Sequence, residues 1–395
     1  MNILAVGRAR IAEEECKVLE LEAVIAAAQA EISEHKAIIA ASQRRLDDYK
    51  YPVLTLPNEI VSEIFIHFLP VYPLCPPLYG PLSPDFLTRI CHKWRRIALG
   101  TPALWRALSL YMAWNTSDAA FEHHVGIAKE WLSRSGCCPI SIDMQDDGYS
   151  VWHTTQLPDV IALHQARWEY AKLDIANSDL HIIGGSKPIL CSLSLTIANN
   201  KSGAGFTPIK APLLRTVSIS GSSSLHTADL LPLSQLTSLK LSGITLEKSW
   251  PVLALTSNLL HCELVLCDAT DVPPDLSLPH LESLILWVWG SGEATDRCLE
   301  PWVLPALRTL QVSGACLGPD PDATLTSFIT KSGCKLEEVR ITGERSYTPK
   351  HYRELFPSIP KFSFNSRLTP NRCPQDEPSV YWELDTDYGS DSGSD

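Results

Sequence analysis

The first fifty residues carry apolar side chains at a seven-residue interval. Residues 4–50 contain no proline and a single glycine, Gly7. An apolar residue at every seventh position of such a stretch predicts a long α-helix with one apolar row. A second row, three positions further on, is interrupted by Glu14, His35 and Ser42. The regular row, called the heptad row below, consists of Leu4, Ile11, Val18, Ile25, Ile32, Ile39 and Leu46.

Two arrangements could cover the heptad row. β-branched residues at this position favour a parallel two-stranded coiled coil, which predicts a homodimer through residues 4–49. Most flanking charges would then match, although Arg45 would face Lys50. In the alternative arrangement, the helix packs on the body of its own chain. The matching pairs of the dimer would be Arg10 with Glu15, Lys17 with Glu22, and Glu31 with Lys36.

A short amphipathic helix is predicted directly after residue 56. Pro57 in its first turn and Glu59 at its positive end are both favourable there. Pro70 ends the helix, and the loop 71–82 that follows is rich in proline. One face of this helix is apolar, and it comprises Ile60, Ile64, Phe65, Phe68 and Leu69.

A second helix is predicted between Ser83 and Gly100. Ser83, Pro84 and Asp85 provide a cap, a proline and an acid in the order that starts a helix, and glycine is a typical end. A short third element is expected over residues 101–108. The predicted buried stripe of the second helix comprises Phe86, Ile90, Cys91, Trp94, Ile97 and Ala98.

This layout resembles the F-box. The family pattern opens with Leu-Pro-x-Glu-Ile, continues in a second helix with Cys-x-x-Trp-Arg-x-Ile-Ala, and then has Pro-x-Leu-Trp. The matching pieces are residues 56–60, 91–98 and 102–105, within a segment of about 55 of 395 residues. The loop 71–82 is longer than the usual link of the family. With a heptad helix upstream, the arrangement is similar to the expanded F-box-like families of mushroom-forming fungi.

The resemblance implies binding to the Skp adaptor of a cullin–RING ubiquitin ligase. A segment of this size is too small to bury all of its large side chains alone. Either an apolar groove on the adaptor or the C-terminal body of the same chain would cover the remainder. The positions that match the family, and that the resemblance assigns to adaptor binding, are Leu56, Pro57, Ile60, Ile64, Leu69, Ile90, Trp94 and Ile97, with Leu104 and Trp105 closing the packing.

From residue 190 to residue 341, apolar residues recur in the pattern apolar-x-x-apolar-x-apolar. The pattern begins at residues 190, 214, 236, 259, 281, 307 and 336, at separations of 24, 22, 23, 22, 26 and 29 residues. Alternation within each unit predicts a β-strand, and the period is typical of leucine-rich repeats. A candidate earlier unit and a candidate first strand consist of Tyr170, Leu173 and Ile175, and of Cys137, Ile140 and Ile142.

This repeat resembles the divergent leucine-rich domains found behind many F-boxes. The asparagine typical of such repeats is missing, because Ala198 and Ile244 stand at two of its positions. We expect an irregular solenoid with one parallel sheet, and a compact α/β domain is the alternative. Outward strand residues would bind a target protein or form an ordinary solvated face. The candidates are Ser238, Lys240, Glu263, Ser283, Gln311, Glu338 and Arg340, with Thr216, Ser218 and Thr309 beside them.

Three smaller features complete the pattern. A helix is predicted over residues 119–134, with an apolar face that includes Trp131. His123 and His124 are adjacent, so their side chains would point about 100° apart on that helix, which argues against a shared metal. Trp287 and Trp289 lie on one face after a strand, where burial in the core is expected over a role as a binding anchor.

Composition narrows the class of protein. Apolar residues make up 45% and charged residues 20%, as in globular proteins. The net charge is −12 and no basic stripe occurs, which argues against a nucleic-acid partner. The twelve cysteines are scattered without a C-x-x-C pair, which predicts buried free thiols rather than disulfides or zinc. With no secretory pattern and no apolar run long enough for a membrane, we expect a cytoplasmic or nuclear protein.

Patterns typical of catalysis are missing from the sequence. It contains no G-x-S-x-G, no Gly-Lys pair of a P-loop and no H-E-x-x-H. We therefore expect no enzyme activity, cofactor or metal. The expected function is that of an F-box substrate receptor with adaptor and target as partners. The alternative is an interaction or scaffold protein whose F-box is only structural.

The expected fold is a mixed α+β and α/β repeat protein. Its small all-α F-box would precede an irregular solenoid, and its acidic tail would be disordered because it is highly charged and poor in aliphatic residues. The expected parts are a heptad helix at 1–50, the F-box at 54–110, a helical connector at 111–168, the repeat domain at 169–365 and the tail at 366–395.

Overall fold

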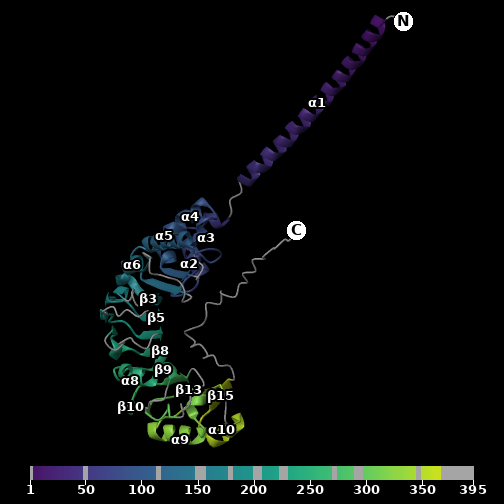
Figure 1. Cartoon of the computed structure of the whole chain (residues 1–395). Helices are drawn as coiled ribbons and strands as arrows, with labels where there is room; N and C mark the ends of the chain where they lie inside the picture. The colour runs from purple at the N-terminus through teal and green to yellow at the C-terminus, as the bar shows by residue number, and fades with distance from the viewer. Residues whose placement is uncertain are drawn as a thin grey trace. The chain divides into compact units, whose positions relative to one another are not determined.

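The computed structural model describes ten stretches of the chain in two compact units, Met1–Val61 and Ser62–Asp395. Together the units contain helices and a long parallel sheet, so the chain is an α/β mixture (Figure 1). The predicted tail at 366–395 and Trp289 lie outside the described residues. The described stretches are 3–47, 52–112, 117–146, 157–176, 181–198, 207–221, 230–268, 274–288, 297–343 and 348–365.

The first unit is dominated by one long helix. Helix α1 (Ile3–Asp47) is continuous over 45 residues, which confirms the helix predicted from the heptad pattern. A 3-10 turn, η1 (Pro52–Thr55), follows, and the unit ends inside helix α2 (Asn58–Phe68). All seven side chains of the heptad row are between 52% and 71% exposed. Their exposure leaves an apolar row of α1 in contact with solvent.

The second unit begins with the rest of α2 and two further helices. The sequence predicted one helix from residue 84 to 99, and this prediction is wrong: α3 (Pro84–Thr88) and α4 (His92–Leu99) are separate. The break arises because Cys91 is extended and its Sγ accepts a hydrogen bond from the Trp94 amide at 3.5 Å, which starts a new helix. The 3-10 turn η2 (Pro102–Trp105) follows α4.

The break also changes which side chains are buried. In the predicted stripe, Ile97 and Ala98 are buried, whereas Phe86 and Ile90 are exposed. Cys91 and Trp94 are half-buried. The prediction assumed a single helical phase across residues 84–98. A cap inside that range resets the phase, so residues on either side of it no longer share a face.

Over the described stretches, eleven parallel strands form the main sheet of this unit. Their order in the sheet is their order in the chain, so each strand lies beside the strands before and after it (Figure 1). The strands are β1 (Ala107–Met112), β2 (Ile140–Asp146), β3 (Trp168–Ala176), β5 (Ser192–Ala198), β7 (Thr216–Gly221), β8 (Ser238–Thr245), β9 (His261–Asp268), β11 (Ser283–Val288), β13 (Thr309–Ser313), β14 (Glu338–Thr342) and β15 (Lys361–Asn365).

The strand register reproduces the predicted repeat positions from β5 onward. The second apolar residue of each unit lies directly beside its equivalents in the neighbouring strands, and each of them is buried. The strand predictions from residue 190 to 341 are therefore confirmed. This row runs through Leu193, Val217, Leu239, Cys262, Leu284, Leu310 and Val339.

The alignment of the earlier strands was wrong by two residues. The sequence made Leu173 equivalent to Leu193, but Ala171 lies beside Leu193 and Leu173 beside Leu195. In β2 the two-residue displacement runs in the opposite direction, because Ile142, the third position of the candidate unit, lies beside Ala171. Small Ala171 occupies an apolar position without being recognisable as one. Strands β1 and β15 were not predicted at all.

Short helices, 3-10 turns and two-residue strands connect the strands of the main sheet. Helix α5 packs on β1, α8 on β8 and α10 on β15. The helix predicted over 119–134 is confirmed as α5. These elements are α5 (Asp118–Arg134), α6 (Leu157–Ala162), α8 (Leu246–Ala254), α9 (Pro321–Ser332), α10 (Pro349–Leu355), η4 (Gln165–Arg167), η6 (Leu233–Gln235), η7 (Gly314–Leu317), and the paired short strands β4 (Gly185–Ser186) with β6 (Ile209–Lys210) and β10 (Leu276–Ser277) with β12 (Trp302–Val303).

The thiols are free but less buried than the sequence predicted. Within the described stretches, eleven cysteines are unpaired. Cys262, Cys298, Cys316 and Cys334 are buried, whereas Cys16, Cys137 and Cys267 are exposed and the others lie between. Burial raises the pKa of the Cys334 thiol, which keeps it in the unreactive protonated form.

Two glycines should respond in opposite directions to replacement by alanine. Gly221 ends β7 with φ +105°, and a Cβ there would collide with the carbonyl oxygen of Ile197 on β5. Gly126 lies within α5 with open space around its Cα. We expect Gly221→Ala to lower the free energy of unfolding by more than about 2 kcal/mol, and Gly126→Ala to raise it by about 0.5–1 kcal/mol. Urea unfolding of both variants measures the contrast, and a similar loss in both would contradict it.

A fully buried lysine directly after β4 binds the turn η4, which precedes β3. Lys187 Nζ donates to the side-chain oxygen of Gln165 at 3.2 Å and to the carbonyl oxygens of Ile183 at 2.5 Å and Gly184 at 2.8 Å. It also lies 5.1 Å from the centre of the Trp168 ring. Burial lowers the pKa of Lys187 to about 8. The three acceptors explain why a lysine is tolerated there without an acidic partner among the described residues.

This lysine predicts a rise in stability with pH. Its pKa is about 8 when folded and 10.5 when unfolded, so the unfolded chain binds more protons between these values. The free energy of unfolding therefore rises by about 3 kcal/mol from pH 8 to pH 10.5, and this contribution is lost as the pH falls through 8. Urea unfolding at pH 7.5, 8.5 and 9.5 should show a steeper rise for the natural chain than for Lys187→Met. Equal slopes would contradict the assignment.

Candidate interaction surfaces

One face of the main sheet carries rows of mostly polar side chains. Side chains alternate between the two faces of a strand, so the residues on either side of the buried apolar row point the opposite way. The register places them side by side from β2 to β15. This row, called the central polar row, consists of Asp143, Lys172, Ser194, Ser218, Lys240, Glu263, Ile285, Gln311, Arg340 and Ser363.

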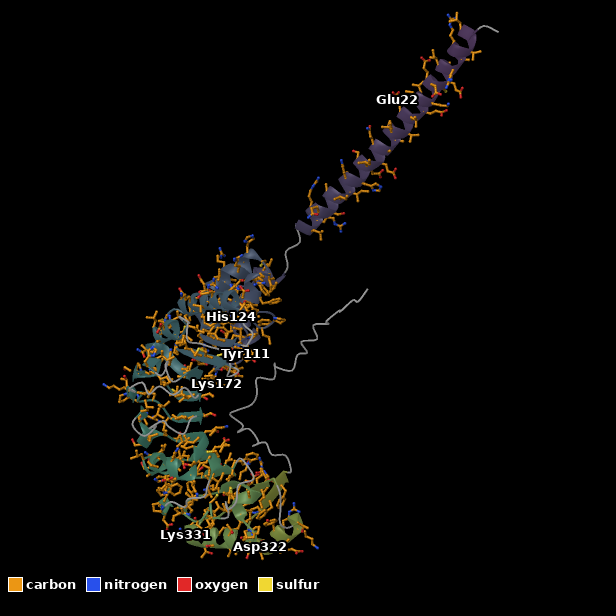
Figure 2. The ribbon with its side chains drawn as sticks, viewed as in Figure 1. Glu22, Tyr111, His124, Lys172, Asp322 and Lys331 are labelled. Carbon is orange, nitrogen blue, oxygen red and sulfur yellow. The ribbon has the colours of Figure 1, made fainter. Side chains whose placement is uncertain are left out.

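Charges on this face are paired across neighbouring strands. Lys240 Nζ lies 3.1 Å from a Glu263 carboxylate oxygen, and Lys172 Nζ lies 3.7 Å from Asp143. Figure 2 labels Lys172 at its place on β3. A Glu338 carboxylate oxygen lies 3.0 Å from Lys361 Nζ on the next strand and 3.1 Å from an Arg340 guanidinium nitrogen on its own strand. Pairing of this kind gives a face of mixed charge, which suits a protein partner better than a polyanion.

Six of the seven predicted target-binding residues are half-buried on this face. Ser238, Lys240, Glu263, Ser283, Glu338 and Arg340 keep part of their side chains accessible. Gln311 is the exception, because it is only 4% exposed. It lies beside Arg340 in the central polar row, and its Nε2 has no hydrogen-bond partner among the described residues. Gln311 is therefore not available for a direct contact.

Trp287 explains why the polar face is closed near Gln311. The indole Nε1 of Trp287, on β11, donates to Thr342 Oγ1, on β14, at 2.8 Å. Because β13 lies between these strands, the indole crosses β13 at a level two residues beyond Gln311. Trp287 and Thr342 are both buried, which confirms the expected burial of this tryptophan. The apolar pattern did not predict that it would lie over the polar side of the sheet.

The predicted adaptor-binding residues divide into two groups. Pro57, Ile60, Ile64 and Ile90 are exposed, and Leu56, Leu69 and Trp94 are half-buried. Ile60 is 50%, Ile64 47% and Ile90 49% exposed. By contrast, Ile97, Leu104 and Trp105 are buried in the core of their own chain. Ile97 is therefore not accessible for a direct contact with a partner, whereas the burial of Leu104 and Trp105 is consistent with residues that close the packing.

Trp105 shows why the second group is inaccessible. Its Nε1 donates to the Ala98 carbonyl oxygen at 2.9 Å. Its ring meets Trp131 of α5 edge-on at 5.4 Å between centroids, and the Arg134 guanidinium lies 4.6 Å from the ring centre. These contacts join η2, α4 and α5 into one packed layer. The family motif Pro-x-Leu-Trp thus supplies core residues here.

Helix α2 packs against α3 and α4 through aromatic pairs. Phe65 meets Trp94 edge-on at 4.9 Å, and Phe68 stacks with Phe86 at 6.4 Å. The Trp94 Nε1 is buried and has no hydrogen-bond partner among the described residues. These contacts fill the space between the helices, so Ile64 and Ile90 are left over as exposed apolar side chains.

The proline-rich loop 71–82 is fastened to the first strands of the sheet. Tyr72 Oη donates to Glu169 at 2.8 Å, and the Arg106 guanidinium lies 3.9 Å from its ring centre. Burial and the Glu169 carboxylate raise the pKa of Tyr72. Ser141 Oγ donates to the Pro73 carbonyl oxygen at 2.7 Å. Ser141 lies on the polar face of β2 and is buried, so the loop covers part of that face.

The other end of the loop meets helix α5. Tyr79 stacks with His123 at 6.2 Å and lies 6.1 Å from His124, which Figure 2 labels. Burial lowers the pKa of His124. Within the described stretches, no cluster of three or more potential ligands for a metal occurs. The sequence identified the length of the loop as unusual but not its docking position, because proline content does not specify tertiary contacts.

The chain matches no protein-family model and no curated protein. Over the described stretches, no helix combines the length and apolar character needed to cross a bilayer. The physical features of the two surfaces, a helical segment with exposed isoleucines and a polar sheet face, therefore carry the functional argument.

Proposed function

We propose that the chain is the substrate-receptor subunit of a Skp–cullin–RING ubiquitin ligase. The observation that carries the proposal is the exposure of Ile64 and Ile90, near 50% each, on a segment whose sequence resembles the F-box. We interpret these two large apolar side chains, left outside a filled helical core, as contacts for a partner. The Skp adaptor would cover both side chains. The edge-on contact with Phe65 would keep Trp94 in position.

We also propose that the sheet belongs to an irregular leucine-rich-repeat solenoid. Support comes from parallel strands that follow chain order at 22 to 29 residues from β5 to β14, each beside its sequence neighbours. In a repeat array of this kind an extended sheet face binds the partner. The polar rows from β5 to β15 would bind a target protein. Other subunits of the ligase would transfer ubiquitin, without a cofactor bound to this chain. The complex would act in the cytoplasm or nucleus.

Co-purification of the full chain with a Skp-type adaptor tests this function. Both proteins are expressed together, and a tag on the adaptor recovers the complex. The proposal expects a stable complex with one adaptor per chain. Its absence at micromolar concentrations of both proteins would overturn the receptor function and leave the alternative below.

The second candidate is an interaction or scaffold protein whose F-box-like segment is only structural. Burial of Ile97, Leu104 and Trp105 in the core of the chain favours it. The attachment of loop 71–82 to Ser141 and Glu169 also favours it, because this loop makes the segment part of the sheet unit. This function predicts target binding by the sheet face and no adaptor binding.

A further inference from the structure

We infer that α1 binds α1 of a second copy of the chain in a parallel, in-register coiled coil. The heptad row keeps more than half of each side chain exposed over seven successive layers. From Leu4 to Leu46 it extends over about 63 Å at 1.5 Å per residue. An apolar row of this length on one helix is unusual without a partner, because each of its layers leaves apolar surface in water.

The weak second row specifies the orientation of the partner. In a parallel pair, each heptad-row residue meets the same residue of the second copy. All seven layers that the heptad row forms therefore join apolar side chains. In an antiparallel pair, the same residues would meet the second row of the partner. That row contains Gly7, Glu14, His35 and Ser42, which would leave polar or small residues opposite isoleucines. The parallel arrangement therefore buries the heptad row more completely.

Charge also favours the parallel register. The flanking pairs of opposite sign would join Arg10 to Glu15 of the second copy, and Glu31 to Lys36 of the second copy. Lys17 already lies 3.2 Å from Glu13 and 3.4 Å from Glu14 on its own helix. Exposed ion pairs of this kind add little affinity. Their effect is to select the register in which opposite charges meet.

Two full chains joined in this way would present two helical segments and two sheet faces together. A target with two binding sites, or a target that is itself a dimer, would then bind with raised effective concentration. The inference does not depend on adaptor binding, because α1 lies outside residues 58–99. It can fail while the proposed function holds, and the reverse is also possible.

Size-exclusion chromatography of the full chain, with its mass measured by light scattering, tests the inference. At 20 µM we expect the mass of a dimer for the natural chain and of a monomer for Ile25→Asp/Ile32→Asp, which places charges in the heptad row. The matched control, Ala23→Asp/Ala30→Asp, introduces the same residues on the opposite side of α1 and should remain a dimer. A monomeric natural chain, as packing of α1 on its own chain would give, overturns the inference. So does a trimer, or equal behaviour of the two variants.

Cross-linking tests the orientation. Ser42 belongs to the second row and Ser33 lies on the outer side of the helix. In a parallel, in-register pair, Ser42→Cys should form an intermolecular disulfide under mild oxidation, whereas Ser33→Cys should not. Because the chain has native thiols, the yield is compared with that of the unmodified chain. No excess for Ser42→Cys in a chain that is a dimer would overturn the parallel arrangement.

Discussion

Replacing Ile64 and Ile90 together by aspartate is expected to weaken binding of the Skp adaptor by at least about 100-fold. Both side chains are exposed, so the change leaves the core of the chain intact. In the complex each would enter an apolar groove, where an unpaired carboxylate loses its hydration without compensation. Titration of the full chain with adaptor measures the loss.

A matched control separates this effect from a general effect of charge. Leu163→Asp/Leu213→Asp introduces the same two charges at apolar side chains that are 83% and 47% exposed, outside the helical segment. This variant should bind the adaptor as the natural chain does. Equal loss in both variants, or none in either, would contradict the assignment of Ile64 and Ile90 to the adaptor.

Trp105→Ala is expected to cause the largest loss of stability among single substitutions in the helical segment. It removes a fully buried indole that packs on Trp131 and Arg134 and donates to the Ala98 carbonyl oxygen. The resulting cavity should lower the free energy of unfolding by about 3–5 kcal/mol. Urea unfolding followed by circular dichroism measures the change.

Replacement by phenylalanine distinguishes the hydrogen bond from the packing. Trp105→Phe keeps an aromatic ring but removes the indole donor to the Ala98 carbonyl oxygen, which still accepts from the Thr101 amide at 3.3 Å. Loss of this hydrogen bond should cost about 0.5–1.5 kcal/mol. Trp94 provides the comparison, because its buried Nε1 has no partner among the described residues. Trp94→Phe should therefore cost less than Trp105→Phe. The reverse order would contradict the roles given to the two indoles.

The sequence was most informative where a pattern repeats. Seven apolar-x-x-apolar-x-apolar units predicted the strands from β5 to β14, because each unit buries the same positions and the register places them in one row. The heptad pattern likewise predicted α1. Where Ala171 replaces a larger apolar residue, the pattern was misaligned by two positions.

Features that depend on tertiary contacts could not be predicted. The helix cap at Cys91 interrupts a stretch that has helical periodicity. The hydrogen bond from the Trp94 amide to Cys91 Sγ cannot be recognised from the positions of the apolar residues. The position of Trp287 across β13 requires Thr342, which lies 55 residues later in the chain. For the candidate sites, the sequence assigned one role to Ile64, Ile90 and Ile97, although Ile64 and Ile90 are exposed and Ile97 is buried. A family motif does not say which of its side chains its own chain will bury.

Hydrogen–deuterium exchange of the full chain, alone and with excess Skp adaptor, tests the central claim most directly. The proposed function predicts slower exchange in residues 58–69 and 84–99 when the adaptor is present, and unchanged exchange in β7 to β14. Protection confined to the sheet, or no change anywhere at adaptor concentrations of tens of micromolar, would contradict it.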